Sequence, residues 1–141
     1  FVFYTNFNSK KGGELKDNQK SSMCFHWKSL RRQVRVIGKV EEVTSKEADD
    51  YYNSRPYKNR ISAWASSQSQ ILDKRETFLN KIKEFEKKYS DENNVPRPPH
   101  WSGWRLMPDE IEFWVDGEGR IHERLNYKNT NGKWNKEILY P

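Results

Sequence analysis

The sequence has one cysteine, few aliphatic residues and no long apolar run, and each shortage excludes a class of protein. Cys24 has no partner for an intrachain disulfide, which favours a reducing compartment and predicts a cytoplasmic protein. No apolar run approaches the length of a membrane span and no signal peptide is visible, so we expect no membrane association. Hydrophobic residues make up only 33% of the chain, so much of the burial must come from large aromatic rings or from an oligomer interface.

What the chain does have is length for one domain, over 1–141, and an excess of positive charge. The net charge of +6 favours an anionic partner such as a phosphate ester, a nucleic acid or a membrane surface. The Lys and Arg residues interleave with 20 acidic residues, and no RNA-binding signature is visible, which argues against nucleic acid. The three histidines lack metal-ligand spacing, so we expect no metal site.

Hydrophobic periodicity predicts an α+β fold whose antiparallel sheet closes into a barrel. Strands are expected over 1–5, 22–27, 33–43, 101–107, 110–116, 120–128 and 133–139. Helices are expected over 45–54, over 61–66, and behind the cap signature Asp73-x-x-Glu76, while 6–13 reads as a polar loop. A bulge or bend is expected at Gly38.

The hairpin around the sequence DGEG places several polar side chains on one face. A three-residue loop over 117–119, with Gly119 in the left-handed conformation, would set Trp114 opposite His122. The same register would pair Asp116 with Arg120 and Glu112 with Arg124. Trp114, Arg120, His122 and Arg124 would then share a face, either as the floor of a ligand site or as a solvated surface. The pattern alone favours the solvated surface.

Two further segments could bind an anion. Tyr51 and Arg55 lie one helical turn apart and could grip a phosphate, although an ordinary amphipathic helix explains them equally well. The run Ser9-Lys10-Lys11-Gly12-Gly13 lacks the spacing of a phosphate-binding loop, so a basic turn explains it better.

Several sequence blocks follow one another in an order that resembles one family. They are FVFYTN, RRQVRVIGKVE, YYNSRP, AWASSQS, PPHWSGWRLMPDEIEFW and RIHERLNY, and they span essentially the whole chain. They resemble the pyridoxamine 5′-phosphate oxidase family. The resemblance implies an FMN-binding split barrel with flanking helices, which forms a homodimer with FMN at the subunit interface. It also implies oxidation of pyridoxamine or pyridoxine 5′-phosphate to pyridoxal 5′-phosphate, with O2 reduced to H2O2.

The resemblance also implies which residues form the sites. Those expected to bind FMN are Tyr4, Thr5, Lys10, Lys11, Gln33, Gln68, Ser69, Trp114 and Arg124. Tyr51, Arg55 and Asn59 are expected to bind the substrate phosphate, and Arg120 and His122 to hold the pyridine ring as the catalytic pair. Two positions depart from the family pattern: Lys10 stands where Arg is usual, and Asn59 where Ser is usual.

A larger departure concerns an upstream block, R-x-V-L-L-K, which the family has before the position of Phe1 and which this sequence does not contain. We therefore expect the family's first strands to lie outside this chain, either because the chain is a fragment or because the protein is naturally shorter. Two alternatives to the oxidase follow: an FMN-binding split-barrel protein without oxidase activity, and a basic module that binds single-stranded nucleic acid.

Overall fold

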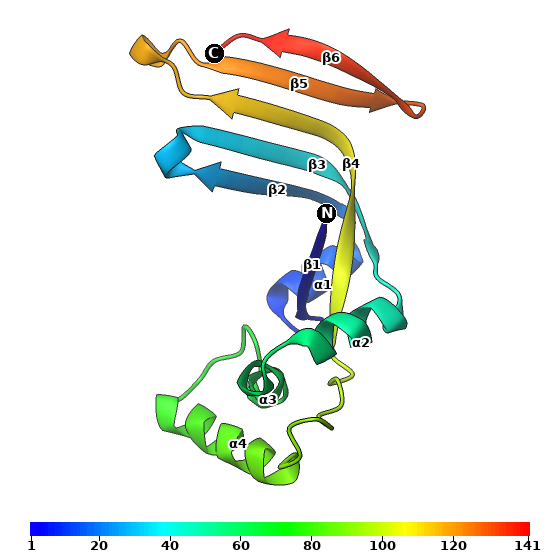
Figure 1. Cartoon of the computed structure of the whole chain (residues 1–141), viewed down its shortest axis with the longest axis vertical. Coiled ribbons are helices and arrows are strands. Elements are labelled where there is room, and N and C mark those ends of the chain that lie inside the picture. Colours follow the sequence, from blue (N-terminus) through cyan, green and yellow to red (C-terminus); the bar gives the residue numbers. More distant parts are fainter. The chain divides into compact units, whose positions relative to one another are not determined.

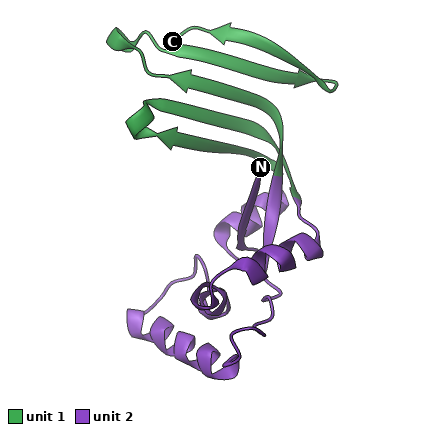
Figure 2. Ribbon diagram, viewed as in Figure 1, with its two compact units in different colours: residues 1, 18–41, 106–141 green, residues 2–17, 42–105 purple.

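The computed structural model describes all 141 residues, which form two compact units (Figure 2). Unit 1 comprises Phe1, Asn18–Glu41 and Leu106–Pro141, and unit 2 comprises Val2–Asp17 and Glu42–Arg105. The long strand β4 (Trp101–Val115) begins in unit 2 and ends in unit 1. The α+β class with an antiparallel sheet and flanking helices is confirmed.

Unit 1 is built on an antiparallel sheet (Figure 1), in which the strand order is β2-β3-β4-β5-β6. The bounds are β2 (Lys20–Trp27), β3 (Arg32–Glu42), β5 (Glu123–Thr130) and β6 (Lys133–Leu139), with short 3-10 turns η1 (Lys28–Leu30) and η2 (Glu118–Arg120). Cys24 pairs with Arg35 across β2 and β3, and Leu125 pairs with Ile138 across β5 and β6. β4 therefore lies in the middle of this sheet, where a side chain can have neighbours on both flanking strands.

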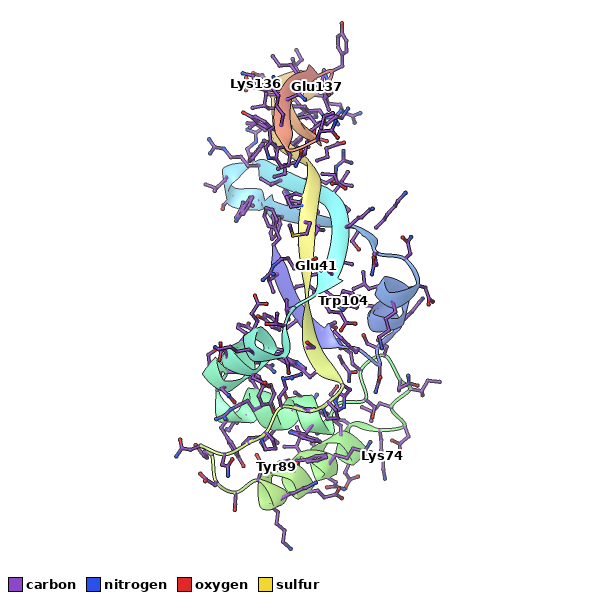
Figure 3. All side chains as sticks on the ribbon, turned by 90° about the vertical axis from the view of Figure 1, so that its right-hand side faces the viewer. Glu41, Lys74, Tyr89, Trp104, Lys136 and Glu137 are labelled. Atoms are coloured by element: carbon purple, nitrogen blue, oxygen red, sulfur yellow. The ribbon has the colours of Figure 1, made fainter.

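Unit 2 carries the helices. They are α1 (Lys10–Asp17), α2 (Ser45–Ser54), α3 (Tyr57–Ala65) and α4 (Arg75–Lys88), and strand β1 (Val2–Asn6) pairs antiparallel with the first part of β4. Lys74 and Tyr89 mark the two ends of α4 (Figure 3). Fully buried Tyr52 and Ile61 join α2 and α3 in the core. No helix of the structure combines the length and the apolar character needed to cross a membrane.

Local signals explain where α2 begins and ends. The Thr44 hydroxyl accepts from the backbone N–H of Glu47, and the Glu47 carboxylate accepts from the backbone N–H of Thr44, which completes the predicted capping box. The helix ends at Ser54 because Pro56 disfavours a helical conformation at Arg55, whose ψ is 146°. These two signals fix the predicted bounds of α2.

Two of the predicted elements were wrong in kind or number, and the helix expected over 61–66 begins earlier, at Tyr57. The segment expected to be a polar loop contains α1, which begins where the Ser9 hydroxyl accepts from the backbone N–H of Gly12 and buries Leu15. The two strands expected over 101–107 and 110–116 are one strand, β4, which runs through Pro108. Proline has a φ compatible with an extended strand, so it removed one donor without breaking β4.

Candidate functional site

In unit 1, four of the predicted site residues come together where β3, β4 and β5 lie side by side. Trp114 lies directly opposite Arg124 in the β4–β5 register. The ring of Trp114 is 4.8 Å from the imidazole of His122, centroid to centroid. Gln33 of β3 and Trp114 line the same open pocket of about 390 Å³, whose other walls are largely apolar and include Leu30. The arrangement offers an aromatic surface with an amide beside it.

The predicted register of this hairpin was wrong by two residues. Trp114 opposes Arg124 rather than His122, and β5 begins only at Glu123, so Arg120 and His122 lie in the connection. The connection spans 116–122 and is longer than the three residues predicted, and within it the backbone N–H of Gly117 donates to the side-chain Nδ1 of His122. Since the shift is an even number of residues, Trp114 and Arg124 still share a face.

Gly119 has the predicted left-handed conformation, with φ of 63°. Arg120 follows it with φ of 65°, which is uncommon for a residue with a side chain. The Arg120 side chain is exposed on this turn. It does not lie on the strand face where the sequence placed it.

His122 is oriented by polar groups on both sides of Nδ1. That nitrogen lies 3.2 Å from Asp116 Oδ1 and 3.2 Å from the backbone nitrogen of Gly117. Nδ1 accepts from the Gly117 N–H in the tautomer that carries its proton on Nε2, and it donates to Asp116 when the proton is on Nδ1. Asp116 is itself held, because Arg31 Nε donates to its Oδ2 at 2.7 Å. In either state the Nε2 nitrogen is left for a ligand.

Glu112 is a functional candidate that the sequence placed in the hairpin without assigning it a role. Its buried side chain accepts at Oε1 from Arg124 Nε (2.8 Å) and at Oε2 from Arg35 Nη2 (2.6 Å). The hydrogen bond from Arg124, with the charge of Arg35 added, lowers the pKa of Glu112 although burial opposes this. The signal in the sequence that could have identified Glu112 is its charge at a position on the central strand of the sheet.

In unit 2, aromatic rings from three elements form a stack. Tyr4 stacks on Tyr51 with ring centroids 3.9 Å apart and on Trp101 with centroids 5.2 Å apart. The guanidinium of Arg55 lies over the Trp101 ring, 4.9 Å from its centroid. Burial, followed by the charge of Glu47, raises the pKa of the Tyr4 phenol. The stack therefore unites one predicted cofactor residue with both residues of the predicted phosphate grip.

Trp101, the ring that joins this stack, was missing from the predicted site. Its side chain is buried, and its edge also meets the ring of Tyr52 at 5.2 Å. The sequence offered only its place at the start of a predicted strand, which does not distinguish a core ring from a binding ring.

A second group in unit 2 lies around Gln68. The Thr5 hydroxyl and the backbone N–H of Asn6 both approach Gln68 Oε1, at 3.4 Å and 3.2 Å. Ser69 beside it has φ of 69°, so the backbone at this point is held in an uncommon conformation. The structure thus brings Thr5 and Gln68 together and places Ser69 next to them.

The remaining predicted residues of unit 2 are exposed. Lys10 and Lys11 form the first turn of α1, where Lys10 Nζ lies 3.9 Å from Glu14 and Lys11 Nζ lies over the Phe3 ring. Asn59 is on the first turn of α3, and its backbone carbonyl accepts from the Ser62 hydroxyl.

Comparison with known proteins assigns both parts of the chain. Residues 1–89 match the family model described as "Pyridoxamine 5'-phosphate oxidase", and residues 101–141 match "Pyridoxine 5'-phosphate oxidase C-terminal dimerisation region". A protein of Pelagibacter ubique named "Pyridoxine/pyridoxamine 5'-phosphate oxidase" is 63% identical over 142 residues, covering 100% of this chain and 68% of the relative. A protein of the same name from Brucella canis is 52% identical over 143 residues, covering 100% of this chain and 70% of the relative.

Two solved structures are similar in fold. PhzG from Burkholderia lata, in complex with tetrahydrophenazine-1-carboxylic acid, superposes with a TM-score of 0.90 at 30% identity, covering 99% of this chain and 68% of that one. A Nostoc punctiforme protein described as pyridoxamine 5'-phosphate oxidase-related and FMN binding has a TM-score of 0.75 at 16% identity, covering 99% of this chain and 72% of that one. The second likeness concerns the fold alone.

Proposed function

The chain belongs to the pyridoxamine 5′-phosphate oxidase family, an oxidoreductase family, and we propose that it oxidises pyridoxamine or pyridoxine 5′-phosphate to pyridoxal 5′-phosphate. We propose FMN as the cofactor and O2 as the electron acceptor, with H2O2 as the second product. The observation that carries the proposal is the convergence of Trp114, Arg124 and His122 on one patch of unit 1, because these residues were predicted independently of the structure.

The residues of unit 1 fit a flavin. An isoalloxazine ring needs a flat apolar wall and hydrogen-bonding groups along one edge, and Trp114 with the Gln33 amide supplies both in one pocket. Arg124 adds a guanidinium whose side chain is 28% exposed, so it can still meet a ligand. Bound FMN would supply the redox chemistry by taking two electrons from the substrate.

In unit 2, Thr5, Lys10, Lys11, Gln68 and Ser69 supply the hydroxyl, amide and ammonium groups that we assign to the polar parts of FMN. Lys10 and Lys11 are exposed and carry the positive charge that a phosphate monoester requires. The Gln68 amide, already held by Thr5, offers its NH2 group as a donor.

Tyr51 and Arg55 are assigned to the phosphate of the substrate, with Asn59 as a third contact. The Nη1 nitrogen of Arg55 is buried and has no hydrogen-bond partner, which is costly unless an acceptor meets it. A phosphate oxygen would be such an acceptor after a small movement of the side chain. Binding energy gained at the phosphate would then hold the rest of the substrate in place for reaction.

Arg120 and His122 are assigned to the pyridine ring of the substrate. His122 Nε2 would hydrogen-bond the ring, since Nδ1 is already engaged by Asp116 or Gly117. Arg120, exposed on the adjacent turn, would hold the substrate ring against the flavin during oxidation.

We assign unit 1 as the surface that meets a second copy of the chain, with FMN at that interface. The match of residues 101–141 to a dimerisation region supports this. Trp27, Phe113 and Ile138 of the same unit are each 42% or more exposed in the single chain, as a homodimer interface would require.

The experiment is a titration of the purified chain with FMN, followed by addition of pyridoxamine 5′-phosphate in an oxygen electrode. We expect bound flavin, oxygen uptake and formation of an aldehyde that reacts with a hydrazine reagent. Bound flavin without oxygen uptake would support a flavin-binding protein that lacks oxidase activity. Salt-dependent retention of single-stranded nucleic acid by a colourless protein would support the nucleic-acid module.

A further inference from the structure

The carboxylate of Glu112 is buried in the middle of the sheet of unit 1. Its side chain is 5% exposed, and both of its oxygens are used: Oε1 accepts from Arg124 Nε and Oε2 from Arg35 Nη2. Arg124 lies on β5, Glu112 on β4 and Arg35 on β3, so the carboxylate links three neighbouring strands.

The charge of Glu112 is retained in spite of its burial. Desolvation by itself would raise the pKa of a carboxylic acid, whereas the hydrogen bond from Arg124 lowers it and the charge of Arg35 adds to the effect. The same hydrogen bond raises the pKa of Arg124. Glu112 is therefore an ionised acceptor at neutral pH, which is the form that binds a guanidinium most strongly.

Arg124 is held at two points. Its Nε donates to Glu112 at 2.8 Å and its Nη1 donates to the backbone carbonyl of Tyr140 at 3.0 Å. Because a guanidinium is planar, two fixed nitrogens fix the direction of the whole group. Trp114 lies directly opposite Arg124 in the register, so this direction is set relative to the proposed flavin wall.

We propose that Glu112 is a positioning residue of the cofactor site, which fixes the guanidinium of Arg124 in the orientation that binds the flavin. The inference rests on the proposed function, because the role of Arg124 in binding FMN is part of it. Arg35 pairs with the second carboxylate oxygen of Glu112. The two guanidiniums and the one carboxylate together carry one net positive charge beside the site. That charge suits an anionic cofactor.

The first test needs no cofactor. The Nε–H of Arg124, assigned in a ¹⁵N NMR spectrum by its absence from Arg124→Lys, should exchange slowly with water in the flavin-free 141-residue chain. Glu112→Gln should make this exchange faster, because the neutral amide offers one acceptor oxygen to two guanidiniums and holds neither through charge. An Arg124 signal that exchanges as slowly in Glu112→Gln as in the wild type would overturn the proposal.

The second test is a double-mutant cycle on the dissociation constant of FMN. Glu112→Gln should weaken FMN binding by about five- to thirtyfold, the range expected for removal of one coupled polar interaction. Glu112→Gln combined with Arg124→Ala should bind no more weakly than Arg124→Ala alone, since Glu112 acts through Arg124. Additive losses would show a merely structural role and would contradict the proposal.

The matched control is Glu137→Gln. Glu137 lies on β6 and is labelled in Figure 3. The change removes a carboxylate that pairs with Lys128 at 3.1 Å in the same sheet but is 45% exposed. We expect it to leave both FMN affinity and the Arg124 signal unchanged. Equal effects of the two Glu→Gln changes would contradict the proposal.

If Glu112→Gln does not fold, Glu112→Asp replaces it in both tests. The shorter side chain retains the charge but withdraws from Arg124, so an intermediate loss of protection and of affinity is expected. Wild-type behaviour in both tests would overturn the proposal. If the wild-type chain binds no FMN, the proposed function fails, and the NMR result alone decides whether Glu112 fixes Arg124.

Discussion

The ring of Tyr4 stacks on the ring of Tyr51, with centroids 3.9 Å apart and planes inclined by 15°. The sequence predicts that Tyr4 binds the cofactor, and we assign Tyr51 to the substrate phosphate, so the two proposed binding functions share one aromatic contact. Trp101 extends the stack to Arg55. A change to one of these rings should therefore be felt by both ligands.

Tyr51→Ala should weaken the binding of both ligands, because it removes the phenol at the phosphate and the ring that packs on Tyr4. We expect KM for pyridoxamine 5′-phosphate to rise by more than tenfold. The free energy of FMN binding should weaken by about 0.5–1.5 kcal/mol, the contribution of one aromatic pair. Tyr51→Phe is the control, since it keeps the ring and removes the hydroxyl. An FMN dissociation constant that is the same in Tyr51→Ala as in wild type would show that the stack does not couple the two sites.

Arg120→Ala should lower turnover far more than FMN affinity, because Arg120 is assigned to the substrate ring and not to the flavin. Steady-state kinetics and an FMN titration on the same preparation measure the two effects. Equal losses in both would rule out the assigned role.

Arg120→Gly should make the protein more stable than Arg120→Ala while turnover stays low. The residue has φ of 65°, and a side chain in the left-handed region costs about 1 kcal/mol that glycine avoids. Thermal unfolding of the two variants, compared with each other, measures the difference. A lower Tm for the glycine variant would contradict this description of the turn.

Gly12 and Gly13 are adjacent in α1 and should respond to alanine in opposite directions. A Cβ on Gly12 would lie 2.4 Å from the backbone oxygen of Phe7, whereas a Cβ on Gly13 meets nothing within 4 Å. We expect Gly13→Ala to stabilise the protein by about 0.5–1 kcal/mol, as in other helices, and Gly12→Ala to destabilise it. Urea unfolding of both variants decides the matter, and changes of the same sign would argue against a helix at 10–17.

The Tyr52 phenol should make the protein less stable at alkaline pH. Burial raises the pKa of Tyr52 from 10.0 to about 12 in the folded chain. Below pH 10 neither state ionises this phenol, so its contribution is fully present; between pH 10 and about 12 the unfolded chain ionises first and stability falls. Tyr52→Phe should be less stable near neutral pH, because it loses the hydrogen bond to the Arg60 carbonyl, and should show a shallower alkaline loss. Chemical unfolding of the wild type and of Tyr52→Phe across this pH range measures how the free energy of unfolding of each falls with pH. Parallel curves for the two proteins would contradict the raised pKa of Tyr52.

The parts of the fold that depend on local chemistry were predictable from the sequence. Thr44, Glu47 and Pro56 fix α2 through interactions within a few residues, and the left-handed Gly119 follows from turn geometry. The α1 helix was missed because two adjacent glycines have low helix propensity, and the burial of Leu15 that offsets this is a tertiary contact.

The face that Trp114 and Arg124 share was predictable from the sequence, and the geometry around it was less so. Trp114 and Arg124 share a face under either register because the alternation of a strand has period two. The connection is longer than predicted, and it contains a hydrogen bond from the Gly117 backbone to the His122 side chain that no pattern in the sequence encodes. The burial of Glu112 and the ring stack at Trp101 depend on segments far apart in the chain, which periodicity does not place together.

The most direct test of the central claim is to mix the FMN-loaded chain with pyridoxamine 5′-phosphate in the absence of oxygen and to record the flavin absorbance. If the chain oxidises this substrate, the oxidised-flavin band should bleach and should return when air is admitted, with pyridoxal 5′-phosphate recovered in equal amount. A flavin band that stays unchanged with saturating pyridoxamine or pyridoxine 5′-phosphate would contradict the account.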